Sequence, residues 1–319
     1  MAGDKPDVLL VGARKPVMMK GFEGKVTLHD WLSLQDKAAF LKEHSAKIRA
    51  IAIAYTANKV DGAFMSQFPK LEQISSFGVG YDHIDAKWAG EHGIIVTNTP
   101  EVLNEEVADT ALGLLLNTVR EFVQADQYLR AGKWASQGHY PLTKATLRDR
   151  KVGIVGMGRI GKAIAKRLDA FGVPVVYHSR NPQAGVTYKY YPKLLDMARD
   201  VDTLIVIVPG GASTQNMINA EVLKALGPNG IVVNMARGTL VDDAAEVGAS
   251  PSTFDSNTGG GSGLAATLGA PPPPSTGVVR RKRYVYCRVT ARTCPAMRAG
   301  LNTSCRAAAT AWAPRPNPK

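Results

Sequence analysis

Short runs of apolar residues alternate with stretches of helical periodicity along residues 7–98. The apolar runs cover residues 8–11, 51–55, 74–77 and 94–96, and the helical stretches include residues 37–48 and 85–92. Short apolar strands that alternate with helices are typical of a parallel sheet covered on both faces. The pattern therefore predicts an α/β lobe in which ligands bind beyond the carboxyl ends of the strands.

The third apolar run leads into a turn with two glycines, Gly78-Val79-Gly80. Two glycines around one residue let backbone N–H groups face a small anion, but an ordinary tight turn has the same spacing. Asp82, His83 and Asp85 lie close enough in the sequence to suggest a metal site. Because no further ligands are evident, we expect a solvated loop in which Asp85 caps the next helix, and no metal.

A longer helical pattern covers residues 103–130. Apolar residues recur on one face of it, and Glu105, Glu106 and Asp109 place negative charge toward its positive N-terminal end. The apolar face fits burial in a core, and a helix of this length can also link two lobes or contact a partner subunit. The sequence leaves these alternatives open.

The strongest signal is a glycine-rich turn between a strand and a helix. Residues 151–155 form the expected strand, residues 162–168 start the helix, and the turn between them is Gly156-Met157-Gly158-Arg159-Ile160-Gly161. The first glycine allows a tight bend, the second lets a pyrophosphate approach the backbone, and the third lets helix and strand pack closely. The helix N-terminus adds N–H donors and a favourable dipole. We therefore predict that these six residues bind a dinucleotide.

The end of the next strand indicates which dinucleotide is bound. Sites that select NAD place an acidic residue there to hold the ribose 2′-hydroxyl. Here the strand over residues 173–177 is followed by His178, Ser179, Arg180 and Asn181, with no acid. A serine can hydrogen-bond a 2′-phosphate, and an arginine can form charge-assisted bonds to it. We expect NADP(H) to be preferred and NAD(H) to be possible; the alternative is a surface Arg180 with selectivity set elsewhere.

Two later strands, over residues 204–208 and 231–235, end near further candidate site residues. We expect Pro209, Thr214 and Met235 to contact the cofactor. Arg237 lies just past the second strand, where a guanidinium suits a bidentate clamp on a carboxylate. An ordinary surface arginine explains this position equally well.

Charge is distributed unevenly along the 319 residues, whose net charge is +12. Residues 1–245 carry 29 basic and 25 acidic residues, a net charge of +4, whereas residues 246–319 carry ten and two, a net charge of +8. All six histidines lie in the first part, and all three cysteines lie in the second. Most of the positive charge therefore lies in residues 246–319, where the composition changes. It does not indicate that residues 1–245 bind nucleic acid.

No apolar run reaches the ~20 residues of a membrane span. The N-terminus also lacks the basic-then-apolar pattern of a secretory signal. We therefore expect a cytoplasmic protein with no membrane partner, and the distribution of charge argues against a nucleic-acid partner.

Four motifs occur in order within residues 7–245 and carry a family resemblance. They are Gly78-Val79-Gly80-Tyr81-Asp82, Val107-Ala108-Asp109-Thr110-Ala111-Leu112, the turn from Gly156 to Gly161, and Asn234-Met235-Ala236-Arg237-Gly238-Thr239-Leu240-Val241-Asp242. The sequence resembles the D-isomer-specific 2-hydroxyacid dehydrogenases, and within them the glyoxylate/hydroxypyruvate and 2-ketogluconate reductase branch. The resemblance implies two Rossmann-like or flavodoxin-like lobes with parallel sheets and a cleft between them. Residues 1–98 are then the substrate-binding lobe and residues 99–245 the NAD(P)-binding lobe.

The resemblance also implies the chemistry. The backbone at Val79 and Gly80 holds the substrate carboxylate, and Arg237 is the catalytic residue that binds and polarises the 2-oxo acid. Hydride passes from NADPH or NADH to a small 2-oxo acid such as glyoxylate or hydroxypyruvate, which gives the D-2-hydroxy acid. A histidine, whose pKa a glutamate raises, protonates the new alkoxide. Members of the family are commonly dimeric, so a homodimer is implied.

Residues 246–319 depart from the family pattern. The resemblance places the glutamate, the histidine, further strands and a returning helix there, but the segment contains no histidine and only Glu246 and Asp255 as acids. We expect irregular or disordered structure, and a cofactor lobe that is incomplete at its C-terminal end. An out-of-frame reading of a GC-rich gene, a basic tail for an anionic partner, and a zinc site from three cysteines are alternative explanations, of which the cysteine spacing disfavours the last. A catalytically impaired dinucleotide-binding protein is thus the alternative to a reductase.

Overall fold

The structure is a computed structural model, and it describes residues 5–54, 56, 58–143, 145–242 and 283–286. The described residues up to Leu103 form one compact unit and those from Asn104 form a second. The possible zinc ligands Cys287, Cys294 and Cys305 lie outside the described residues, as does most of the basic tail. Within the part of the chain that is described, no helix has the length and apolarity needed to cross a membrane.

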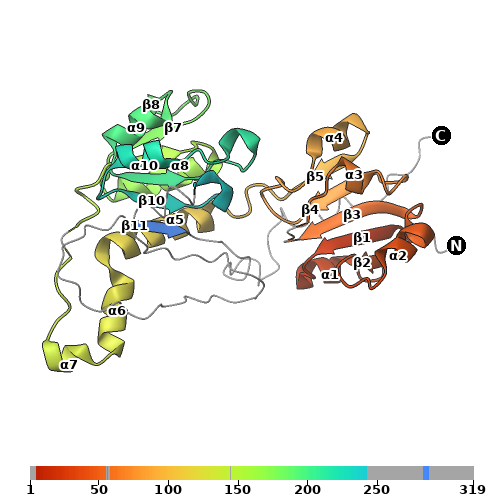
Figure 1. Ribbon diagram of the computed structural model, residues 1–319, viewed down its shortest axis with the longest axis horizontal. Coiled ribbons are helices and arrows are strands. Elements are labelled where there is room, and N and C mark those ends of the chain that lie inside the picture. The colour runs from red at the N-terminus through yellow and green to blue at the C-terminus, as the bar shows by residue number, and fades with distance from the viewer. Residues whose placement is uncertain (1–4, 55, 57, 144, 243–282, 287–319) are drawn as a thin grey trace. The chain divides into compact units, whose positions relative to one another are not determined.

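The first unit is a five-stranded parallel sheet with the strand order β2-β1-β3-β4-β5 (Figure 1). Its strands are β1 (Asp7–Gly12), β2 (Thr27–Asp30), β3 (Ile48–Ala54), β4 (Gln73–Ser76) and β5 (Ile95–Thr97). Its helices are α1 (Pro16–Phe22), α2 (Lys37–His44), α3 (Gly62–Met65) and α4 (Ala86–Glu91). This is the flavodoxin-like order, and it confirms the predicted α/β lobe.

Side chains that alternate along the strands build a core on each face of this sheet. On one face, Ile51 and Ile53 of β3 pack with Phe40 of α2 and Met65 of α3. On the other face, Val8, Leu10, Ala50 and Ala52 pack against residues of α1 such as Met19 and Phe22. Each large apolar side chain that is buried contributes about 1.5–3 kcal/mol. The two cores hold the strands in register and so fix where each strand ends.

The second unit is a six-stranded parallel sheet with the order β11-β10-β9-β6-β7-β8. Its strands are β6 (Val152–Val155), β7 (Val175–His178), β8 (Lys189–Tyr191), β9 (Thr203–Val206), β10 (Ile231–Asn234) and β11 (Arg283–Tyr286). Counted from β6, this is the Rossmann order 3-2-1-4-5-6 read from the other edge. The order reverses between β6 and β9, so the glycine-rich turn after β6 lies at the switch point where ligands bind.

Helices cover this sheet as well. They are α5 (Asn104–Arg120), α6 (Phe122–Arg130), α7 (Lys133–Gln137), α8 (Arg159–Ala170), α9 (Leu194–Asp200) and α10 (Ala220–Leu226), with 3-10 turns η1 (Ala212–Thr214) and η2 (Gly238–Leu240). On one face Met197 of α9 and Leu223 of α10 pack on Leu204 and Val232 of the strands. Helix α5 packs against α8.

The structure differs from the prediction of one helix over residues 103–130. The helix is broken at Glu121, which has a left-handed conformation with φ of +55°. The hydroxyl of Tyr140 donates a hydrogen bond to the Glu121 carboxylate at 2.8 Å. This contact comes from a residue 19 positions away, so the local apolar pattern does not reveal it. Figure 1 shows α6 and α7 extending away from the sheet of their unit.

The structure also differs from the expectation that residues 246–319 are irregular throughout. Residues Arg283 to Tyr286 form β11, which pairs in parallel with β10 from Ile231↔Arg283 to Asn234↔Tyr286. The sequence Tyr284-Val285-Tyr286 is rich in strand-forming residues, and β10 otherwise presents unpaired backbone groups at the sheet edge.

Candidate functional site

The glycine-rich turn joins the end of β6 to the start of α8, as predicted. Gly156 has φ of +108°, and a Cβ there would lie 2.9 Å from the carbonyl oxygen of Ile207. A Cβ at Gly161 would lie 2.1 Å from the carbonyl oxygen of Gly156, so only glycine lets α8 come this close. A Cβ at Gly158 would meet nothing within 4 Å, and the residue is exposed. The turn is packed toward the sheet and open at Gly158, which fits a pyrophosphate that approaches the backbone there.

The remaining residues of the turn offer mainly backbone groups. The side chain of Met157 is 1% exposed, so it belongs to the core. Arg159 and Ile160 are the first two residues of α8, and they lie at its N-terminal end, where the helix dipole is positive. The N-cap residue is Gly158, which has no side chain that could accept hydrogen bonds from the helix N-terminus. This helix start can therefore donate to an anion.

An ion-pair cluster holds α8 against α5. The guanidinium of Arg167 donates to Asp109 at 2.6 Å and to Glu105 at 2.8 Å. Burial of Arg167 lowers its pKa, but the hydrogen bonds and charges of the two carboxylates outweigh this effect and raise the pKa above its ordinary value. Glu105 and Asp109, which the sequence pattern places near the start of a helix, thus also fix the position of α8, the helix that follows the glycine-rich turn.

The segment after β7 carries the residues predicted for a 2′-phosphate. Ser179 is half-buried and Arg180 is exposed. The backbone N–H of Gly156 donates to the carbonyl of His178 at 2.8 Å, which ties the start of this segment to the glycine-rich turn. The ring of His178 hydrogen-bonds through Nδ1 to the carbonyl of Tyr191 on β8 at 2.8 Å. Two parts of the predicted cofactor site are therefore adjacent at the ends of β6 and β7.

The other predicted cofactor residues lie at the ends of β9 and β10. Pro209 is exposed and follows β9, and the hydroxyl of Thr214 donates to the Pro209 carbonyl at 2.9 Å. Met235 follows β10, and its N–H donates to the carbonyl of Val206 at 2.9 Å. Its side chain is 7% exposed, so it contributes mainly to the core.

Arg237 is exposed just past β10, on a segment that Asn234 braces. The buried Asn234 side chain accepts a hydrogen bond from Ala236 N–H at 3.0 Å and donates one to the Arg237 carbonyl at 2.8 Å. Both bonds fix the backbone from which the guanidinium projects. No role was predicted for Asn234 from the sequence, although it belongs to the last of the four motifs. An asparagine at the end of a buried strand was the available signal, because its amide can close the turn that follows.

The turn Gly78–Gly80 follows β4 in the first unit. Its carbonyl groups are engaged by the next strand connection: Thr99 N–H donates to Gly78 at 3.0 Å, and the Asn98 side chain donates to Val79 at 2.9 Å. These bonds hold the peptide groups of the turn in one orientation. Asp85 accepts from Trp88 N–H at 3.0 Å, which confirms it as the cap of α4.

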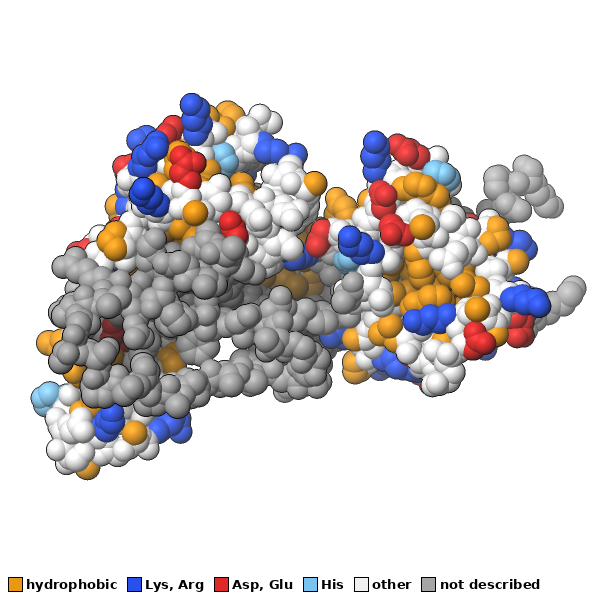
Figure 2. Space-filling model, in the orientation of Figure 1, with side chains coloured by type: hydrophobic (Ala, Val, Ile, Leu, Met, Phe, Trp, Pro, Cys, Tyr) orange, Lys and Arg blue, Asp and Glu red, His pale blue; other side chains and the backbone are white. Residues whose placement is uncertain are grey.

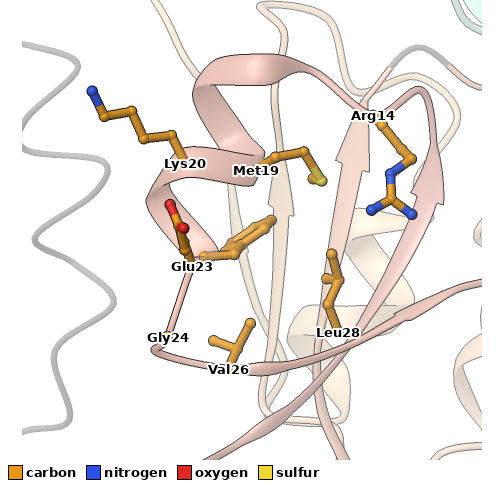
Figure 3. A pocket seen from close by; sticks show the side chains of 8 residues that line it. Arg14, Met19, Lys20, Glu23, Gly24, Val26 and Leu28 are labelled. Carbon is orange, nitrogen blue, oxygen red and sulfur yellow. The ribbon is translucent and has the colours of Figure 1, made fainter.

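A surface pocket of about 560 Å³ lies elsewhere on the first unit, between α1 and β2 (Figure 3). Figure 3 shows Met19, Val26 and Leu28 turned into it and Lys20 turned away. It includes no residue of the glycine turn after β4 and no candidate substrate ligand.

Known proteins are similar to the chain in sequence and in structure. Residues 112–252 match the family described as D-isomer specific 2-hydroxyacid dehydrogenase, NAD binding domain. The chain is 43% identical over 216 residues to a glyoxylate/hydroxypyruvate reductase A of Arabidopsis thaliana, which covers 68% of each protein. It is 41% identical over 241 residues to a 2-ketogluconate reductase of Gluconobacter oxydans, which covers 76% of each.

Solved structures are similar to the chain as well. The chain is similar to an NADPH-dependent glyoxylate/hydroxypyruvate reductase of Sinorhizobium meliloti, crystallised in complex with NADP and malonate. The TM-score is 0.71 and the sequence identity is 46%, over 77% of this chain and 76% of that one.

Proposed function

Because the chain belongs to the family of D-isomer specific 2-hydroxyacid dehydrogenases, which are NAD(P)-dependent oxidoreductases, we propose that it is a reductase of a small 2-oxo acid. Glyoxylate and hydroxypyruvate are the substrates we propose, and a D-2-hydroxy acid is the product. Relatives with 41–46% identity that are named for these substrates or for 2-ketogluconate support this assignment. We also propose that residues 1–98 bind the substrate and residues 99–245 bind the cofactor.

The geometry of the glycine-rich turn carries the proposal for the cofactor. Contacts within the fold require glycine at Gly156 and Gly161. At Gly158, by contrast, no atom lies within 4 Å of the position that a Cβ would take. Room beside an exposed backbone at a helix start is what a pyrophosphate needs. Arg180 after β7 favours NADPH over NADH, and the NADP bound in the Sinorhizobium meliloti protein supports that preference.

The substrate carboxylate is proposed to bind the N–H groups of Val79 and Gly80. The hydrogen bonds from Asn98 and Thr99 hold this turn without using those N–H groups. Arg237, on the braced segment after β10, is proposed to bind the 2-oxo acid by charge-assisted hydrogen bonds and to draw electrons from its carbonyl. When bound, the nicotinamide supplies the hydride.

The new alkoxide must be protonated. For this step the sequence lacks a histidine at the place that the family resemblance implies. The last histidine in the sequence is His178, and it is engaged with β8. This observation favours a second candidate function, a dinucleotide-binding protein with impaired catalysis. Both candidates predict binding of NADPH and differ in turnover.

One experiment separates the two functions. NADPH binding to the full chain is measured by fluorescence, and NADPH oxidation is followed by absorbance with glyoxylate and with hydroxypyruvate. Binding with turnover supports the reductase, and binding without turnover supports the impaired protein. Absence of NADPH binding would refute both. An Arg237→Ala variant serves as the control, since it should retain NADPH binding and lose any turnover.

We further propose that the protein forms a homodimer through the region of α6 and α7. Phe122, Leu129 and Trp134 are each more than half exposed there, and Leu142 is 95% exposed. Figure 2 shows hydrophobic side chains on this part of the surface among lysines and arginines. Exposed apolar groups of this size favour contact with a partner. Sedimentation should give twice the mass of one chain, and Leu129→Lys with Trp134→Lys should give a monomer.

A further inference from the structure

The segment between β7 and β8 is held by two tyrosines, neither of which the proposed cofactor contacts include. The hydroxyl of Tyr190 on β8 donates to the carbonyl of Ser179 at 3.1 Å. The hydroxyl of Tyr177 on β7 accepts from Gln183 N–H at 3.0 Å. Their rings lie 5.4 Å apart, and Tyr177 is 1% exposed. The tyrosines thus hold both ends of residues 179–183.

The Ser179 side chain also bonds within this segment. Its hydroxyl donates to the carbonyl of Asn181 at 2.6 Å, and the Gln183 side chain donates to the same carbonyl at 3.1 Å. A serine hydroxyl has a single proton to donate. In this arrangement that proton is used inside the segment, whereas phosphate oxygens require donors. Arg180 is exposed, and its guanidinium N–H groups can donate charge-assisted hydrogen bonds to a phosphate.

We propose that Tyr190 and Ser179 are positioning residues for NADPH selectivity, and that they act by holding the backbone from which Arg180 binds the 2′-phosphate. This inference rests on the proposed NADPH-dependent function. Ser179 is then a clamp of the segment and not a ligand of the phosphate. Tyr190 fixes the carbonyl of Ser179, so the peptide that leads into Arg180 has its orientation before the cofactor arrives.

Order present before binding contributes to affinity because it lowers the entropy lost on binding. A single hydrogen bond that sets this order is worth about two- to tenfold in affinity. The effect should be confined to ligands with a 2′-phosphate, because the substitutions leave the glycine-rich turn unchanged.

Binding to the full chain tests the proposal without turnover. Adenosine 2′-monophosphate, adenosine 5′-monophosphate and NADH are used as probes, together with NADPH. Tyr190→Phe should weaken NADPH and adenosine 2′-monophosphate about two- to tenfold and leave NADH and adenosine 5′-monophosphate unchanged. Tyr188→Phe is the matched control, because the Tyr188 hydroxyl bonds to Asp169 of α8 and not to this segment. Equal loss for all four ligands, or no loss, would overturn the proposal.

A double-mutant cycle tests the role of Ser179. If Ser179 acts through Arg180, then Ser179→Ala and Tyr190→Phe should have no further effect on adenosine 2′-monophosphate once Arg180 is replaced by alanine. A full additional loss on Ser179→Ala in that background would identify Ser179 as a direct ligand and overturn the clamp. Two further outcomes are distinguishable. If the wild-type protein binds NADH and NADPH equally well, the proposed cofactor selectivity itself is refuted. If the wild-type protein prefers NADPH and Tyr190→Phe keeps that preference, only the positioning role of Tyr190 is refuted.

Discussion

Replacement of Gly161 by alanine should destabilise the second unit by an amount that the turn geometry allows us to estimate. The new Cβ would lie 2.1 Å from the Gly156 carbonyl oxygen, whereas ordinary contacts begin at 3.4 Å. The obstacle is backbone, so α8 must move by roughly the missing 1.3 Å instead of a side chain turning away. Overpacking of this kind costs about 1–3 kcal/mol. For a unit of this size, each kcal/mol lowers Tm by about 2–4 °C.

Gly158→Ala is the matched control, with the opposite expectation. Gly158 has φ of −80° and ψ of −159°, which alanine adopts readily, and nothing lies within 4 Å of its Cβ position. The free energy of unfolding should therefore stay within about 0.5 kcal/mol of wild type. The methyl group would occupy the space proposed for the pyrophosphate, and the loss of one charged hydrogen bond, about 1.5–3 kcal/mol, corresponds to at least about tenfold weaker NADPH binding.

Two measurements on each variant decide the matter. Thermal unfolding is recorded without cofactor, and NADPH affinity is measured by fluorescence titration. Gly161→Ala should lower Tm, and Gly158→Ala should weaken NADPH binding at an unchanged Tm. A Gly158→Ala protein that binds NADPH like wild type would refute the assignment of this turn to the pyrophosphate. A Gly161→Ala protein with the wild-type Tm would refute the packing argument.

Three further predictions follow from described contacts. Arg150→Met should cost about 2–3 kcal/mol in urea unfolding, because the Arg150 guanidinium donates to Thr203 Oγ1, to the Asp202 carbonyl and to the Asn229 carbonyl at 2.8–2.9 Å. Hydrogen bonds from Lys151 and Tyr191 lower the pKa of Asp200 below its ordinary value of 3.8, so the ionised carboxylate stabilises the fold above pH 3.8 and this contribution is lost as the pH falls further. The urea midpoints of wild type and Asp200→Asn should therefore differ at pH 6 and converge in acid. In an active preparation Arg237→Lys should lower kcat/KM for glyoxylate about tenfold or more, since lysine cannot form the bidentate pair, while the Kd for NADPH stays the same.

The cofactor turn was predictable because its requirements are local. A buried strand, three glycines at fixed spacing and a helix define it, and the steric limits at Gly156 and Gly161 follow from that one segment. Strands β1, β3, β4, β5, β6, β7, β9 and β10 were visible for the same reason, since each coincides with a short apolar run in the sequence. The flavodoxin-like and Rossmann-like character of the lobes came from the family resemblance, and the strand orders confirm it.

The features that the sequence did not reveal depend on distant partners. The break at Glu121 is accompanied by a hydrogen bond from Tyr140, and the brace of Arg237 depends on the direction of the Asn234 amide. Strands β2 and β8 are short edge strands with few apolar residues, so the neighbouring strand defines them more than their own pattern does. The pairing of β11 with β10 likewise joins residues far apart in sequence.

The position of β6 in the middle of its sheet has a consequence for how the protein is made. Val152 of β6 pairs with Thr203 of β9, which lies 51 residues later in the sequence. Ile231 of β10 likewise pairs with Arg283 of β11, which lies 52 residues later. Closing such long loops costs entropy before any contact offsets it, so parallel sheets of this kind fold slowly. At a synthesis rate of about 5–20 residues per second, β6 waits on the order of 3–10 s on the ribosome for β9. During that interval the apolar strand that carries the glycine-rich turn is open to the wrong partners, and chaperones that cover such strands should raise the yield of folded protein.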